Sequence, residues 1–363
     1  MGTALHNALA AIDEETEGRP EMALMRAKAR GLMRGYDARW SAQQYAAVSV
    51  EDVLTAQLYN PETLARSRTF ALAGKIDVRA ELDNRAVLID HKTTSEDITD
   101  PNSQYWRQLI VEGQLSHYLL LEWLNGRKAD AAVWDVIRKP SISPRQLTKP
   151  EQKELTFSKT WFGSELSEDQ IQEAIASGRE TYLLYEVRLA HDCITERPER
   201  YFQRRTIPRL DSEIMEYARE LWDHSQDIIV ARRTGRHPRN SGACMLYGSP
   251  CHFLGVCSGY DDIDSDKWQR KAWVHSELPV LSDKSGAEIL TNSRVRAWQT
   301  CRRKHQFSYE FGVERVEVED RDSLIFGTLM HKALAAWWRC YIPQGGNDGN
   351  YSSAPVIEAG IAS

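Results

Sequence analysis

The chain has 363 residues, of which 42% are hydrophobic, and it carries a formal net charge of −6. This length exceeds that of most single domains, so we expect one large domain with an additional element. No stretch approaches the ~20 apolar residues that cross a bilayer, and the first residues lack the layout of a signal peptide. These features exclude a membrane partner and predict a cytoplasmic protein, in which structural disulfides are rare.

The first half of the chain changes repeatedly between helical and strand-like patterns. One helix is predicted from residue 4 and a second over residues 22–40, and the break at Gly18-Arg-Pro20 separates them; strands are predicted over 46–60, 69–79 and 86–90. A helix over residues 103–124 and a strand over 131–137 follow. This order predicts an α/β (α+β) core, in which helices flank a small mixed sheet.

The second half is more polar. Helices are expected over residues 168–184 and 211–233, the second with Asp211 as its N-cap. We expect a linker over residues 261–287 and a helical extension over 288–340. Residues 341–363 are rich in Gly, Asn and Ser, which predicts a disordered tail.

A short motif occurs twice. Gly2-Thr-Ala-Leu-His6-Asn-Ala-Leu-Ala10 is repeated as Gly327-Thr-Leu-Met-His331-Lys-Ala-Leu-Ala335, with seven of nine positions identical or conservative. Chance explains such a match poorly. We therefore interpret residues 288–340 as a partial repeat of a segment that belongs near the beginning of the chain.

Two acidic residues lie near the ends of neighbouring predicted strands, in Gly74-Lys-Ile-Asp77 and in Asp90-His-Lys92. Carboxylates that converge there can bind Mg²⁺ together with a substrate phosphate. Asp90 and Lys92 share one strand face, so the lysine can orient a water molecule or neutralise charge on the phosphate. The side chain of His91 points to the other face.

Asp-x-Lys alone is a weak signal, since charged residues are common at strand ends. The motif gains weight from Gln114 and Tyr118, which follow on the next predicted helix. Their spacing of four residues places both side chains on one helix face. An ordered set of this kind is difficult to reach by accident.

With these motifs the chain resembles the RecB-like branch of the PD-(D/E)XK nuclease superfamily. That branch carries a helix histidine, Gly-x-x-Asp, (Asp/Glu)-x-Lys and Gln-x-x-x-Tyr in this order. The corresponding residues here are His6, Asp77, Asp90, Lys92, Gln114 and Tyr118. The resemblance covers residues 1–260 and implies a nuclease domain with a restriction-endonuclease-like fold.

The resemblance also assigns roles. It implies that His6, Asp77 and Asp90 bind Mg²⁺ or Mn²⁺, with the backbone carbonyl of His91 as a further ligand. A histidine ligand favours Mn²⁺, because imidazole is a softer donor than oxygen. Lys92 then serves catalysis, and Gln114 and Tyr118 help to place the DNA strand. Glu51, in the preceding strand, is a candidate outer-shell carboxylate.

Three cysteines, Cys244, Cys251 and Cys257, lie close together. Clustered thiolates in a cytoplasmic protein suggest a metal rather than a disulfide. AddB-type and CRISPR-associated RecB-like nucleases bind a [4Fe–4S] cluster with three such cysteines and a fourth that precedes the histidine helix. Zinc and free thiols are the alternatives.

The fourth cysteine of that pattern is missing upstream. Residues 290–307, which contain Cys301, resemble the missing element but lie near the other end of the chain. Two explanations stay open. Either the tail begins a truncated second nuclease copy, or it folds back and Cys301 completes the cluster.

The sequence thus predicts a divalent-metal-dependent deoxyribonuclease. We expect an exonuclease that acts on DNA ends or single strands in recombination, repair or phage DNA processing, with a helicase or recombination protein as candidate partner. The alternative is a non-catalytic DNA-binding module derived from a truncated nuclease.

Overall fold

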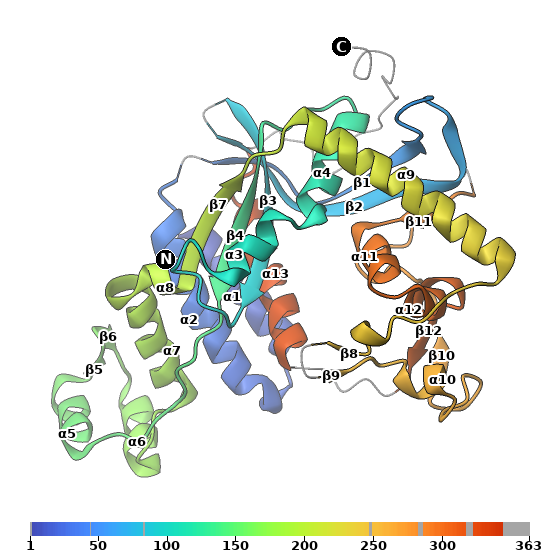
Figure 1. Cartoon of the computed structure of the whole chain (residues 1–363). Helices are drawn as coiled ribbons and strands as arrows, with labels where there is room; N and C mark the ends of the chain where they lie inside the picture. The colour runs from blue at the N-terminus through green and yellow to red at the C-terminus, as the bar shows by residue number, and fades with distance from the viewer. Residues whose placement is uncertain are drawn as a thin grey trace.

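The computed structural model describes residues 2–43, 45–82, 84–246, 249–281, 286–316 and 322–343. It confirms the predicted mixed α/β class, with a central mixed sheet and helices on both of its faces (Figure 1). In the part of the chain that is described, no helix combines the length and apolarity of a membrane span. Of the tail predicted over residues 341–363, residues 344–363 lie outside the described residues.

The main path of the central sheet contains five strands in spatial order, β1 (Ala46–Tyr59), β2 (Arg66–Leu82), β3 (Arg85–Thr94), β4 (Ala131–Arg138) and β7 (Phe202–Ile207). Along this path β3 and β4 pair in parallel and the other neighbours are antiparallel. The first seven residues of β4 are all buried, as is typical of a strand that helices cover on both faces.

A sixth strand comes from the far end of the chain. β11 (Glu288–Leu290) pairs in parallel with β2 at residues 70–72, whereas β3 pairs with β2 at residues 78–82. The extension over residues 288–340 is therefore not only helical. It folds back and joins the sheet.

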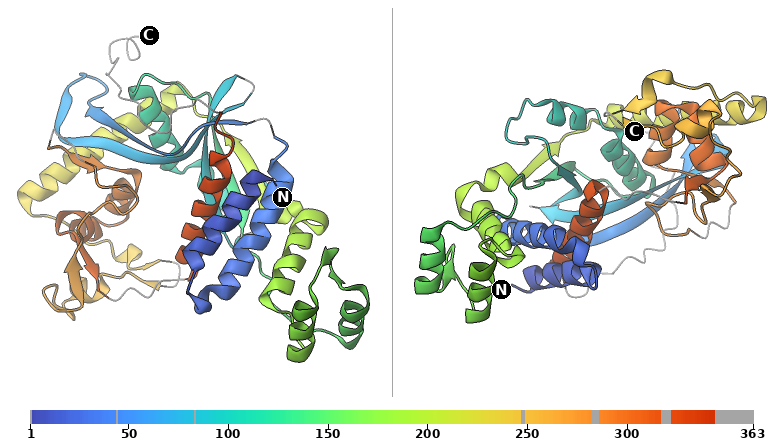
Figure 2. Two further views of the ribbon diagram at one scale, coloured as in Figure 1. Left: turned by 180° about the vertical axis from the view of Figure 1, so that it is seen from behind. Right: turned by 90° about the horizontal axis from the view of Figure 1, so that it is seen from below.

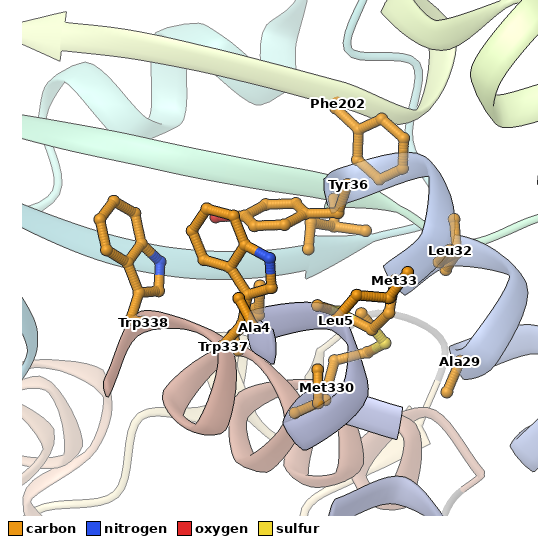
Figure 3. Packing of buried hydrophobic residues seen from close by; sticks show 14 of the residues in the cluster. Ala4, Leu5, Ala29, Leu32, Met33, Tyr36, Phe202, Met330, Trp337 and Trp338 are labelled. Atoms are coloured by element: carbon orange, nitrogen blue, oxygen red, sulfur yellow. The ribbon is translucent and has the colours of Figure 1, made fainter. Parts of the chain in front are cut away.

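Three helices cover one face of the sheet, namely α1 (Thr3–Thr16), α2 (Ala23–Trp40) and α13 (Asp322–Arg339) (Figure 2). The main helices on the other face are α3 (Gln104–Ile110), α4 (Gly113–Leu124) and α9 (Asp211–Thr234). Each face has its own apolar core. In the first, Trp337 and Trp338 of α13 pack beside Tyr36 of α2 (Figure 3).

Between β4 and β7 the chain forms a small lobe with its own apolar cluster around Trp161 and Leu155. Its elements, together with two helices that lead back to the sheet, are α5 (Lys149–Ser158), β5 (Thr160–Trp161), β6 (Ser164–Glu165), α6 (Glu168–Ser177), α7 (Tyr182–His191) and α8 (Pro198–Tyr201). Figure 1 shows the lobe at the lower left, away from α9 and α11.

The remaining elements gather below the curved end of β1 and β2 (Figure 1). They are β8 (Met245–Leu246), β9 (Ser249–Pro250), α10 (Leu254–Ser258), β10 (Trp268–Arg270), α11 (Asn292–Thr300), α12 (Arg302–His305) and β12 (Val313–Arg315). Single turns of 3₁₀- or π-helix occur at Pro20–Met22, Asp192–Glu196, Ser241–Ala243 and Gln306–Glu310. The segment expected as a linker contains β10, which pairs with β12.

Two expected helices are interrupted in the structure. The helix over residues 103–124 is broken before Gly113, where a Cβ would lie 3.1 Å from the Tyr217 ring. The helix over 168–184 ends at Gly178, which adopts the left-handed conformation typical of a helix C-terminus. The N-cap of α9 is Leu210 rather than Asp211, because the Glu213 carboxylate accepts the Leu210 N–H at 2.7 Å.

Candidate active site

Four of the predicted residues meet where β3 faces α4. Asp90 Oδ1 accepts a hydrogen bond from Gln114 Nε2 at 2.8 Å, and Asp90 Oδ2 lies 2.7 Å from Lys92 Nζ. Lys92 in turn donates to Gln114 Oε1 at 2.8 Å. Gln114 also contacts the Tyr118 hydroxyl at 2.7 Å. The side chains of the two motifs, although far apart in sequence, form one network.

Gly74 explains how α4 can approach the sheet so closely. A Cβ at this position would lie 2.9 Å from Leu121 and 3.1 Å from the Tyr118 ring, both on α4. Any larger residue would push α4, and with it Gln114, away from Asp90. The glycine of the Gly-x-x-Asp motif thus has a packing role beside the functional role of Asp77.

Asp77 lies beside this network and connects it to α13. Its Oδ2 accepts the backbone N–H of His91 at 2.8 Å and lies 3.6 Å from Nδ1 of His331. The histidine next to the carboxylates therefore comes from the second copy of the repeated motif. His6 of the first copy is exposed on α1 and, within the described residues, is not part of the candidate metal group.

Glu51 completes the group. Ligand atoms of Glu51, Asp77 and His331 all lie within 4.8 Å of one another, and Glu51 also forms an ion pair with Lys75. Glu51 has a positive φ of 59°, an uncommon conformation for this residue type that is often found at functional sites. The sequence places Glu51 no closer than an outer shell, whereas the structure places it beside Asp77.

The surroundings shift the pKa values of the two aspartates in opposite directions. Burial raises the pKa of Asp90, and the Asp77 charge adds to this effect against the opposing Lys92 charge. Burial acts on Asp77 in the same sense, but His331 and His91 outweigh it and hold its pKa well below the ordinary value. Burial lowers the pKa of His331, yet Asp77 and Asp90 outweigh this and raise it.

The residues present fit a divalent cation. Glu51, Asp77 and His331 offer two carboxylates and an imidazole, a donor set that suits Mg²⁺ or Mn²⁺. The adjacent Asp90 is buried, and its Oδ2, which pairs with Lys92 at 2.7 Å, is a further carboxylate oxygen beside this group. A cleft of about 700 Å³ opens onto the group, and its lining includes Gln114, Lys139 and Arg296.

The four cysteines of the expected cluster also come together. Cys244, Cys251, Cys257 and Cys301 line one small pocket with Phe253 and Phe307. The Cys251 N–H donates to the Cys244 carbonyl at 2.8 Å, and the Asn240 N–H lies 3.4 Å from Cys301 Sγ. Folding back of the tail therefore brings Cys301 to the other three.

The structure thus combines a mixed α/β fold with a candidate divalent-metal site at its central sheet. The family model of the PD-(D/E)XK nuclease superfamily matches residues 1–257 and 289–357, and the chain belongs to this superfamily. The match includes the body as well as the segment that folds back, and it accords with the restriction-endonuclease-like fold predicted from the sequence. Comparison with curated proteins and with solved structures gave no match.

Proposed function

We propose that the protein is a divalent-metal-dependent deoxyribonuclease that hydrolyses phosphodiester bonds. The observation that carries this proposal is the convergence of Glu51, Asp77 and His331 beside the pair Asp90 and Lys92. Two buried carboxylates, those of Asp77 and Asp90, thus lie close to an imidazole and a lysine, and Asp77 and His331 line an open cleft.

The residues have separate roles in this proposal. Asp77, Asp90, Glu51 and His331 hold the metal ion, and His331 takes the role that the resemblance assigns to His6. A bound Mg²⁺ or Mn²⁺ would polarise the phosphoryl oxygens and lower the pKa of water. Lys92 lies at the carboxylate end of the network, where its charge can stabilise the negative charge that develops on phosphorus.

Gln114 and Tyr118 act on the substrate side. Gln114 holds both Asp90 and Lys92 and also lines the cleft. Tyr118 lines the same cleft, and burial beside Asp90 raises the pKa of its hydroxyl well above the ordinary value. A neutral hydroxyl can donate to a phosphate oxygen, so these residues are suited to placing a DNA strand.

The finer reading is an exonuclease of the RecB-like branch. The order of Asp77, the Asp90-x-Lys92 motif and the Gln114-x-x-x-Tyr118 motif supports this reading, as does the pocket that the four cysteines share. We expect a cytoplasmic enzyme that acts on DNA ends or single strands during recombination, repair or phage DNA processing, together with a helicase or recombination protein.

We propose that Cys244, Cys251, Cys257 and Cys301 bind a [4Fe–4S] cluster. Their common pocket supports this role, and a cluster there would connect the body of the chain to the segment that carries His331. Anaerobic purification should yield iron, acid-labile sulfide and an absorbance band near ~400 nm. Cys301→Ser should lose all three, whereas Cys340→Ser, outside the pocket, should retain them. Zinc in place of iron would contradict the proposal.

The nuclease proposal is tested with labelled linear DNA and Mn²⁺. Asp90→Ala and Lys92→Ala should abolish EDTA-sensitive cleavage and leave DNA binding largely intact. Glu186→Gln, which alters a buried carboxylate in the helical layer, is the control for general damage. Binding without cleavage by the wild-type chain would favour the non-catalytic module instead.

A further inference from the structure

Three adjacent strands place charged or titratable residues in a row across the sheet. His91 of β3 is the register partner of Asp135 of β4, and Asp135 is the partner of Arg204 of β7. We call these three residues the transverse row. The row lies on the sheet face that α2 and α13 cover. Lys92 points to the opposite face, which α4 covers. None of the sequence motifs includes Asp135 or Arg204.

The row is buried and closely connected. His91 Nδ1 and Arg204 Nη2 each lie 3.2 Å from Asp135 Oδ2, and the Tyr36 hydroxyl donates to the same oxygen at 2.5 Å. Asp135 is fully buried. Burial alone would raise its pKa, but Arg204, His91 and Tyr36 outweigh burial and hold the pKa well below the ordinary range.

Aromatic rings enclose the far end of the row. The Arg204 guanidinium lies 4.3 Å from the Trp40 ring centroid and 5.3 Å from that of Trp338. Arg204 also donates to the Tyr36 hydroxyl at 2.7 Å. Figure 3 shows Trp337 between Tyr36 and Trp338 in this core, and its ring contacts both of theirs. These contacts hold the Arg204 guanidinium inside the core, where the side chain is only 7% exposed.

The near end of the row contacts the candidate metal site. The backbone N–H of His91 donates to Asp77, and the His91 ring packs edge-on against the His331 ring, with centroids 6.1 Å apart. The same ring lies 6.4 Å from that of Trp338, also on α13. His91 therefore contacts both a carboxylate ligand and the helix that supplies the histidine ligand.

A buried row of this kind is costly for folding. Desolvation of two charges can exceed their mutual attraction, and well-packed apolar residues often serve stability equally well. The neighbouring buried positions of β3 and β4 on this face, Ile89 and Val133, are in fact apolar. Stability alone thus does not account for the row.

We propose that Asp135 and Arg204 are positioning residues of the metal site, which act through His91 to fix Asp77 and His331 relative to each other. This inference rests on the proposed nuclease function. Outer-shell partners of this type orient ligands, and their loss commonly weakens metal binding 10–100-fold. Asp135 fixes the His91 ring, which packs against His331, and a fixed His91 also holds the backbone N–H that binds Asp77.

The test measures Mn²⁺ binding to the metal-free full-length chain, by calorimetry or by electron paramagnetic resonance, without any need for cleavage. Asp135→Asn should weaken Mn²⁺ binding by about 10–100-fold. The matched control is Asp192→Asn, because Asp192 is a buried aspartate that binds a tyrosine, Tyr201, and an arginine, Arg197, in the helical lobe. This control should keep wild-type affinity.

A double-mutant cycle separates positioning from general packing. In a His91→Phe background, Asp135→Asn should weaken Mn²⁺ binding little further, because the residue through which Asp135 acts is already changed. Equal effects in both backgrounds would overturn the inference. If Asp135→Asn does not fold, Tyr36→Phe removes one hydrogen bond to the same oxygen and should weaken binding in the same direction.

Failure of the inference is distinct from failure of the proposed function. A wild-type chain that binds no Mn²⁺ would refute the metal site itself. A wild-type chain that binds Mn²⁺, together with a folded Asp135→Asn variant of equal affinity, would refute only the role of the row.

Discussion

α1 and α13 carry the same nine-residue motif but occupy different environments. Four of the five shared apolar positions are buried in both helices, as Leu9 and Leu334 show, and the exception is Ala10, which is exposed where Ala335 is buried. The shared histidines differ, since His6 is exposed and His331 lies beside Asp77. The motif thus determines which face of a helix is buried, while the neighbours of the helix determine what its histidine can do.

The neighbours explain the difference. α13 packs against β1, β2 and β3, whereas the main partners of α1 are α13 and α2. His331 lies on α13, which contacts the strands, so it can reach a carboxylate of the sheet. His6 lies on α1, which packs on α13 and α2, and it is too far from the strands to do so. Four expected outcomes test this comparison.

The largest contrast concerns the histidines. His331→Ala should reduce Mn²⁺-dependent DNA cleavage by at least about a hundredfold, since even outer-shell changes at metal sites cost 10–100-fold. His6→Ala should leave the rate unchanged. Cleavage assays of the two purified variants check this, and an equal loss in both would mean that the two helices exchange places in solution.

The buried leucines should behave alike. Leu334→Ala and Leu9→Ala each remove a buried side chain, and each should lower the free energy of unfolding by about 2–5 kcal/mol. Urea unfolding monitored by tryptophan fluorescence measures both values. A loss confined to Leu334→Ala would show that α1 is not docked as the structure has it.

Acid should weaken the attachment of the segment that carries α13. Burial raises the pKa of Glu288 on β11, but Arg232 and Arg294 outweigh it and lower the pKa to about 2. Because the folded pKa lies below the ordinary 4.5, the stabilisation is present above pH 4.5 and is lost as the pH falls toward 2. The difference in thermal stability between wild type and Glu288→Gln should therefore shrink over this window. A constant difference would contradict the ion pairs.

The smallest effect concerns the surface between the two helices. Lys332 of α13 forms an exposed ion pair with Glu15 of α1. Such pairs contribute about 0–1 kcal/mol, so Lys332→Ala should change the unfolding free energy by no more than this and leave cleavage unaffected. A larger loss of stability would show that this ion pair contributes more than exposed pairs usually do, and it would contradict the prediction.

The strands that carry the carboxylates were predictable from sequence, because each combines an apolar run with a motif. Asp90 and Lys92 indeed share a network with Gln114, as the alternation of side chains along β3 and the spacing on α4 predict. The class of the fold followed from the order of elements. Local periodicity was sufficient for these features.

Local periodicity could not show which of the two histidines, His6 or His331, lies at the metal site. The repeat makes the two helices nearly equivalent in sequence, and the decision depends on β11, a three-residue strand that pairs with β2 across more than 200 positions. Asp135 and Arg204 gave no signal either, since a charged residue within a strand reads as a solvent-facing position. Only the register of β3, β4 and β7 reveals that they meet.

Because β11 pairs with β2, a segment from near the end of the chain lies beside strands from its first quarter. The hold on His331 depends on non-covalent contacts, namely a short strand ladder, the ion pairs of Glu288 and the packing of α13. In principle such a piece can be supplied as a separate polypeptide. The architecture therefore lends itself to fragment complementation, in which an inactive body regains its metal ligand when the complementary peptide is added.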